Sequence, residues 1–99
     1  MAADFILLPE AEQDLAESYA WYETQAPGLG EEFLRCVDAC ILLIRRNPKL
    51  HIIAHETYRR ALVRRFPYAI FYEHEERRKR IVIYSVFPCA QDPEKWRGR

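Results

Sequence analysis

The chain has 99 residues, 49% of them hydrophobic and 13% aromatic, which predicts one folded domain over residues 1–99 and excludes a disordered chain. It has no apolar run of the roughly 18 residues that span a membrane, and its N-terminus lacks the basic start and cleavage site of a signal peptide. The odd number of cysteines (Cys36, Cys40 and Cys89) argues against a secreted disulfide framework. We therefore expect a cytoplasmic protein without membrane association.

The charges sum to zero but are unevenly distributed along the chain. Residues 1–50 hold four Lys or Arg and nine Asp or Glu, a balance of −5. Residues 51–99 hold eleven Lys or Arg and six Asp or Glu, a balance of +5. The basic half has two interpretations that the sequence leaves open. It is either a surface for a phosphate backbone or an acidic partner protein, or a solvated sheet surface.

The N-terminal half predicts a short strand and two amphipathic helices. Asp4–Leu8 is a mostly apolar strand that ends at Pro9, a residue suited to the first turn of a helix because its φ is already helical. Helices are predicted over Pro9–Gln25 and Leu29–Arg46, each with an apolar stripe at helical spacing. Trp21 lies outside the stripe of the first helix. The short Pro- and Gly-containing turn between the helices predicts an antiparallel helical hairpin.

The C-terminal half predicts a loop followed by three strands. Pro48–Thr57 has no clear period and is expected to be a loop. Strands are expected at Tyr58–Arg65, Tyr68–His74 and Arg80–Phe87, and the last two are rich in aromatic and β-branched residues. The charged segment Glu75–Lys79 is expected to connect these two strands as a hairpin.

The predicted order is β-α-α-β-β-β, an α+β fold with an antiparallel sheet and the helical hairpin packed on one face. The last two strands are apolar on both sides, although the helices cover only one side. We therefore expect the other face to be an apolar patch that a partner protein covers. The internal alternative is the C-terminal tail, in which Asp92–Trp96 is expected to form one helical turn.

Three stretches of the sequence have the order and spacing of a known family. They are residues 9–15 running into 21–23 and 27–34, residues 58–68, and residues 71–72 through 86–87 to 92–96. Together they resemble the RelE/ParE superfamily of toxins from type II toxin–antitoxin systems. The resemblance implies a β-α-α-β-β-β fold and a cognate antitoxin that wraps the toxin, so that a hetero-oligomer forms. It implies contact with operator DNA only through the antitoxin.

The resembled family contains two kinds of toxin, and the resemblance does not choose between them. RelE-like members are ribosome-dependent mRNA endoribonucleases, whereas ParE-like members poison DNA gyrase. RNA cleavage by 2′-hydroxyl attack requires groups that accept and donate a proton, and cations for the charge on the phosphorane. The chemistry of the side chains must therefore decide.

Cations are plentiful on the strand predicted at Tyr58–Arg65. Alternation on this strand places Arg60 and Arg64 on one side and Arg59 and Arg65 on the other, and either pair is a candidate for binding phosphate or a target. The alternative is that these arginines meet solvent or an acidic antitoxin. If the chain is a ribonuclease, the proton is transferred either by ribosomal groups or by Tyr68.

The proton-transfer group is harder to find. In nuclease-like members of the family, the last strand leads into a His-x-x-Arg-x-Pro segment, but here Pro88 and Gln91 occupy the His and Arg positions. No His or Tyr follows Tyr84, which we interpret as a core residue. The sequence therefore favours a ParE-like toxin directed at gyrase. A RelE-like ribonuclease and an inactive member that only binds its antitoxin are the alternatives.

Further candidate residues concern partners and metals. The aromatic residues expected to meet the antitoxin are Trp21, Phe71, Tyr84 and Trp96. The pair Cys36 and Cys40, followed by His51 and His55, superficially resembles a zinc pattern. We interpret both cysteines as buried structural residues, since they lie on the core side of an amphipathic helix. No metal or cofactor is expected.

Overall fold

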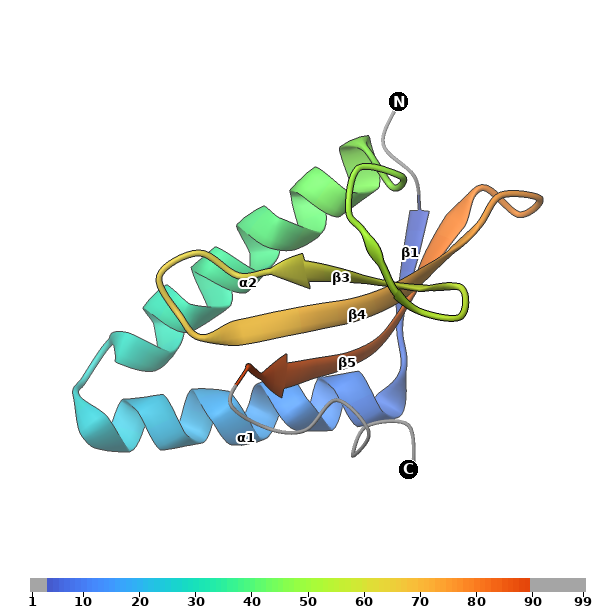
Figure 1. The fold of residues 1–99 in the computed structure, drawn as a ribbon. Helices are drawn as coiled ribbons and strands as arrows, with labels where there is room; N and C mark the ends of the chain where they lie inside the picture. The colour runs from blue at the N-terminus through green and yellow to red at the C-terminus, as the bar shows by residue number, and fades with distance from the viewer. Residues whose placement is uncertain (1–3, 90–99) are drawn as a thin grey trace.

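The computed structural model describes residues 4–89 and contains two helices and a five-stranded sheet (Figure 1). The elements in chain order are β1 (Asp4–Leu7), α1 (Pro9–Gln25), α2 (Leu29–Arg46), β2 (Ile53–His55), β3 (Tyr58–Leu62), β4 (Tyr68–Glu75) and β5 (Arg80–Pro88). The α+β class and the bounds of both helices are as predicted. No helix in this part of the chain is long and apolar enough to cross a membrane.

The sheet differs from the prediction in two respects. Its strand order is β1-β5-β4-β3-β2, and β1 pairs with β5 in parallel while the other pairs are antiparallel. The predicted antiparallel sheet is therefore found from β2 to β5, whereas β1 lies parallel to β5. The segment predicted as a loop contains β2, which pairs with β3 as an edge strand, and the Arg60 amide donates to the Ile52 carbonyl over 3.1 Å. A strand of three residues is too short to produce a recognisable period.

Strand β3 is shorter than predicted. It ends at Leu62 rather than Arg65, and Arg65 has a left-handed backbone with φ 72°. The chain turns back at this point, and the amides of Val63 and Tyr68 donate to the carbonyls of Tyr68 and Phe66. Strand alternation therefore stops before Arg64.

The helical hairpin is fixed by a carboxylate in the last part of α1. Glu23 accepts hydrogen bonds from the backbone amides of Gly28 (3.2 Å) and Gly30 (2.9 Å) at the start of α2. These amides have no partner within the helix, and a negative charge is favourable at this end of the helix dipole. Gly28 has φ 85°, which a residue without a side chain adopts without strain. Glu23 thus replaces the missing side-chain cap of α2.

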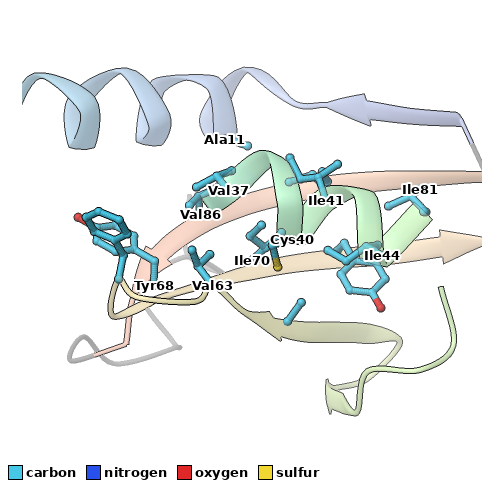
Figure 2. Packing of buried hydrophobic residues seen from close by; sticks show 14 of the residues in the cluster. Ala11, Val37, Cys40, Ile41, Ile44, Val63, Tyr68, Ile70, Ile81 and Val86 are labelled. Carbon is cyan, nitrogen blue, oxygen red and sulfur yellow. The ribbon is translucent and has the colours of Figure 1, made fainter. Parts of the chain in front are cut away.

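The main core lies between the helices and the sheet (Figure 2). It includes the apolar stripe of α2, with Phe33 and Ile44 fully buried, and inward residues of β4 and β5 such as Ile70 and Ile83. Aromatic rings close one end of this core, and the ring centroids of Phe33 and Tyr68 lie 4.9 Å apart. Each fully buried side chain of this size contributes about 1.5–3 kcal/mol to folding.

A smaller cluster occupies the opposite face of the sheet. It consists of Ala69, Phe71 and Phe87, with Tyr58 and Tyr84 packed against it. Alternation along β4 places the side chains of Ala69 and Phe71 on the face away from the main core. Phe71 is only 4% exposed and Phe87 only 8%. The expectation that this face is an exposed apolar patch was therefore wrong at these residues, because the second face has a small core of its own. The expected Asp92–Trp96 turn lies outside the described residues.

A half-buried acid, Asp14, joins α1 to the irregular middle of β5. The pairing of β4 with β5 shifts register at Phe71 and Tyr72, which leaves Tyr84 as the extra residue of a β-bulge. The Asp14 carboxylate accepts hydrogen bonds from the Ser85 hydroxyl (3.2 Å) and the Val86 amide (3.0 Å). A bulge frees backbone groups from the ladder, and Asp14 supplies the acceptor that these groups need.

Candidate functional site

The four arginines proposed to bind phosphate do not form one group. Arg59 donates to the His51 carbonyl over 2.6 Å and to the Lys49 carbonyl over 3.3 Å, so it fastens the segment before β2 to the sheet. Arg65 pairs with Glu32 of α2 over 3.1 Å. The predicted pairing of Arg59 with Arg65 on one side of a strand was therefore wrong. Both side chains have acceptors within the chain.

Arg60 and Arg64 remain candidates for a target. Arg60 lies opposite Phe71 in the β3–β4 pair, and its buried Nε has no hydrogen-bond partner within residues 4–89. Arg64 is exposed in the turn after β3. Because β3 ends at Leu62, the predicted sharing of one strand face by these two arginines was wrong. Their role in binding a target stays a prediction.

Neither tyrosine is placed to exchange a proton readily. Tyr68 is buried in the aromatic part of the main core, beside Phe33. The Tyr84 hydroxyl donates to the Glu73 carboxylate over 3.1 Å, and its ring packs edge-to-face on Tyr58 with centroids 4.9 Å apart. Burial, and then the negative charge of Glu73, raises the pKa of Tyr84 well above its usual range. Tyr84 therefore stays protonated near neutral pH.

The Glu73 carboxylate is a polar centre that the sequence reasoning missed. Besides the Tyr84 hydroxyl, it accepts a hydrogen bond from the Thr57 hydroxyl in the β2–β3 connection. Its position in a charged run at the end of a predicted strand made it indistinguishable from a solvated acid. Glu73 joins β4, β5 and the β2–β3 connection on the second face of the sheet.

The predicted antitoxin contacts have different surroundings. Trp21 is 56% exposed on α1, with one edge against Tyr22 at a centroid distance of 4.9 Å. It therefore remains available to a partner. Phe71 is buried and Tyr84 half-buried, while Trp96 lies outside the described residues. Binding of the antitoxin to these four residues stays a prediction.

Four exposed aliphatic side chains lie in or just before β2 and at the end of its neighbour β3. Leu50 is 68% exposed, Ile52 64%, Ile53 55% and Leu62 60%. We call these four residues the apolar edge. β2 is the last strand of the sheet, so its outer backbone groups face no other strand of the described chain. In the sequence, the adjacent residues Ile52 and Ile53 were the only sign of this surface. Their segment has no hydrophobic period, so it was predicted to be a loop.

The interpretation of two buried cysteines holds for Cys40, whereas Cys36 is only half-buried on α2. The Cys40 thiol donates to the Leu62 carbonyl at 3.6 Å, and burial raises the pKa of Cys40 to about 11. A protonated, buried thiol is a poor metal ligand. Within residues 4–89, no group of three or more His, Cys, Asp or Glu is arranged to hold a metal ion.

Solved structures share this fold. A chain of the "chromosomal ParDE TA system from P. aeruginosa" matches with TM-score 0.76 and 13% identity, over 88% of this chain and 96% of that one. A chain of the toxin–antitoxin complex RelBE2 from Mycobacterium tuberculosis matches with TM-score 0.63 and 16% identity, over 89% of this chain and 99% of that one. No curated protein matches by sequence. This chain therefore shares its fold with chains of the ParDE and RelBE2 structures.

A match to a family model assigns the sequence to a protein family. The family model described as "ParE toxin of type II toxin-antitoxin system, parDE" matches residues 5–93. This chain belongs to that family, and it is a toxin of a type II toxin–antitoxin system. The resemblance found in the sequence is thereby confirmed.

Proposed function

We propose that this toxin inhibits growth by binding a macromolecular target, DNA gyrase in the first place, and that a cognate antitoxin neutralises it. The observation that carries the proposal is the separation of the groups a ribonuclease would need to bring together. Arg59 and Arg65 are engaged by acceptors within the chain, Tyr68 is buried, and Tyr84 is held protonated beside Glu73. These placements favour action by binding over bond cleavage.

The apolar edge is the surface that best suits the antitoxin. Its four side chains are 55–68% exposed, and full burial of one such side chain contributes about 1.5–3 kcal/mol. An antitoxin that buries the exposed part of all four would therefore stabilise the complex by about 5 kcal/mol. The outer side of β2 also offers backbone groups to an added strand, which is a common mode of peptide recognition. Two of the structures with this fold come from toxin–antitoxin systems, which supports such a partner.

Induction of this chain alone in a bacterium tests the proposed target. We expect growth arrest with filamentation and accumulated gyrase–DNA cleavage complexes, and rescue when the antitoxin is co-expressed. Rapid cleavage of translated mRNA at ribosome-positioned sites, without gyrase complexes, would refute gyrase as the target. Unchanged growth would identify a member that only binds its antitoxin.

A matched pair of variants tests the target-binding surface. Arg60→Ala with Arg64→Ala removes the two arginines that remain candidates for a target, and we expect it to abolish toxicity without unfolding the domain. Arg35→Ala with Arg46→Ala changes the net charge equally on exposed positions of α2, and we expect toxicity to persist. Equal toxicity of the two double variants would show that Arg60 and Arg64 do not form the target-binding surface.

The alternative function is that of a RelE-like ribosome-dependent mRNA endoribonuclease. The observation that favours it is the buried Arg60 Nε, which has no protein acceptor in the described part of the chain and would suit a phosphate oxygen. In this case the proton route would come from ribosomal groups. The mRNA cleavage measured after induction separates this alternative from the first proposal.

A further inference from the structure

The connection between β4 and β5 carries three adjacent cations away from the body of the protein. Glu76–Lys79 forms a tight turn in which the Lys79 amide donates to the Glu76 carbonyl over 3.2 Å, and Lys79 has a left-handed backbone with φ 52°. Arg77, Arg78 and Lys79 are exposed, and Figure 1 shows the hairpin extending beyond the rest of the sheet. We call these three residues the basic tip.

The acidic neighbours of the basic tip are engaged by other cations. Glu75 forms an ion pair with Arg80 across the neck of the hairpin, where these two residues are also the last cross-strand pair. Glu76 forms an ion pair with Lys49 from the segment after α2. Within residues 4–89, no ion pair joins a carboxylate to Arg77, Arg78 or Lys79. The tip therefore presents about three units of uncompensated positive charge.

The composition of the hairpin end indicates what kind of partner fits it. All six residues from Glu75 to Arg80 are charged, and a shallow hollow there is lined by Glu75, Glu76, Arg77 and Arg78. The centres of protein–protein interfaces are depleted in charge and enriched in aromatic residues, whereas nucleic-acid interfaces are polar and strongly positive. Arginine forks also match the geometry of phosphate oxygens.

We propose that the basic tip binds the phosphodiester backbone of nucleic acid. The contact is electrostatic and independent of base sequence, since the tip offers only cations at the end of a narrow hairpin. This site lies apart from Arg60 and Arg64 and is independent of which target the toxin inhibits. It also gives the toxin a direct contact with the phosphates of DNA or RNA, in addition to the contact with operator DNA that the resemblance implied only through the antitoxin.

Salt dependence of binding by the purified full-length chain tests the proposal. Fluorescence anisotropy would follow binding to a labelled 20-base-pair DNA duplex and to RNA of the same sequence. Three phosphate contacts predict a slope of about −2.7 for log K against log salt on DNA, which is about fortyfold weaker binding at 200 mM than at 50 mM salt. Tighter binding to the DNA duplex or to the RNA identifies which of the two nucleic acids the tip prefers.

A charge-matched pair of variants separates the tip from net charge. Arg77→Gln with Arg78→Gln is expected to reduce the slope to about −0.9, or about three- to fourfold weakening over the same salt range. Arg35→Gln with Arg46→Gln removes two exposed cations from α2 and is expected to keep the original slope. Circular dichroism would verify that both variants are folded.

Three results would overturn the proposal. The first is that the wild-type chain binds neither duplex at 50 mM salt. The second is that both double variants weaken binding equally, which would indicate a general charge effect. The third is that the tip variant loses affinity only for the antitoxin, which would identify the tip as a protein contact.

Discussion

The Asp14 carboxylate at the bulge of β5 offers a sharp test of how α1 is held to the sheet. We predict that Asp14→Ala lowers the free energy of unfolding by about 3 kcal/mol. Two hydrogen bonds to a charged acceptor are lost, from the Ser85 hydroxyl and the Val86 amide, and such bonds contribute about 1.5–3 kcal/mol each. The two bonds together contribute about 3–6 kcal/mol. Water hydrogen-bonds to the freed groups in the variant and recovers part of this loss, so we expect the lower end of the range.

Urea denaturation followed by circular dichroism measures this loss. With a slope of about 1.5 kcal/mol per M, the midpoint would move down by about 2 M. Asp14→Asn keeps an acceptor and should lose less than half as much, while Ser85→Ala removes only one of the two bonds. Asp38→Ala, at an exposed position of α2, is the matched control and should stay within about 0.5 kcal/mol. An Asp14→Ala midpoint equal to that of Asp38→Ala would refute the reasoning.

Three further predictions concern the antitoxin, the hairpin and pH. Ile52→Asp should weaken antitoxin binding at least tenfold in calorimetry, since about 1.4 kcal/mol corresponds to tenfold, whereas Leu42→Asp on α2 should not. Gly30→Ala should destabilise the protein by about 1–3 kcal/mol in urea, because a Cβ would lie 2.7 Å from the Tyr19 carbonyl oxygen; unchanged stability would contradict this packing. Burial raises the pKa of Tyr72 to about 12, so stability should fall as pH rises from about 10 to 12, and less in Tyr72→Phe.

Local sequence patterns determined the helices and the hairpin of long strands. The strong apolar period of α2, together with Pro9 and the Pro- and Gly-containing turn that bound α1, placed both helices at their observed bounds. Aromatic and β-branched residues identified β4 and β5 in the same way. The resemblance to the toxin superfamily rested on these same segments, and the family match confirms it.

Only the tertiary structure decided how the polar residues are partnered. Arg59 and Arg65 looked equivalent to Arg60 and Arg64 in the sequence, yet the end of β3 at Leu62 and the Glu32 carboxylate of α2 separate them. Asp14, 71 residues from Ser85 along the chain, gave no local signal of its role. Periodicity reports which face of an element is apolar, whereas hydrogen bonds and ion pairs between distant segments depend on how those elements pack in space. For the same reason the parallel pairing of β1 with β5 and the exposed apolar edge emerged only from the folded chain.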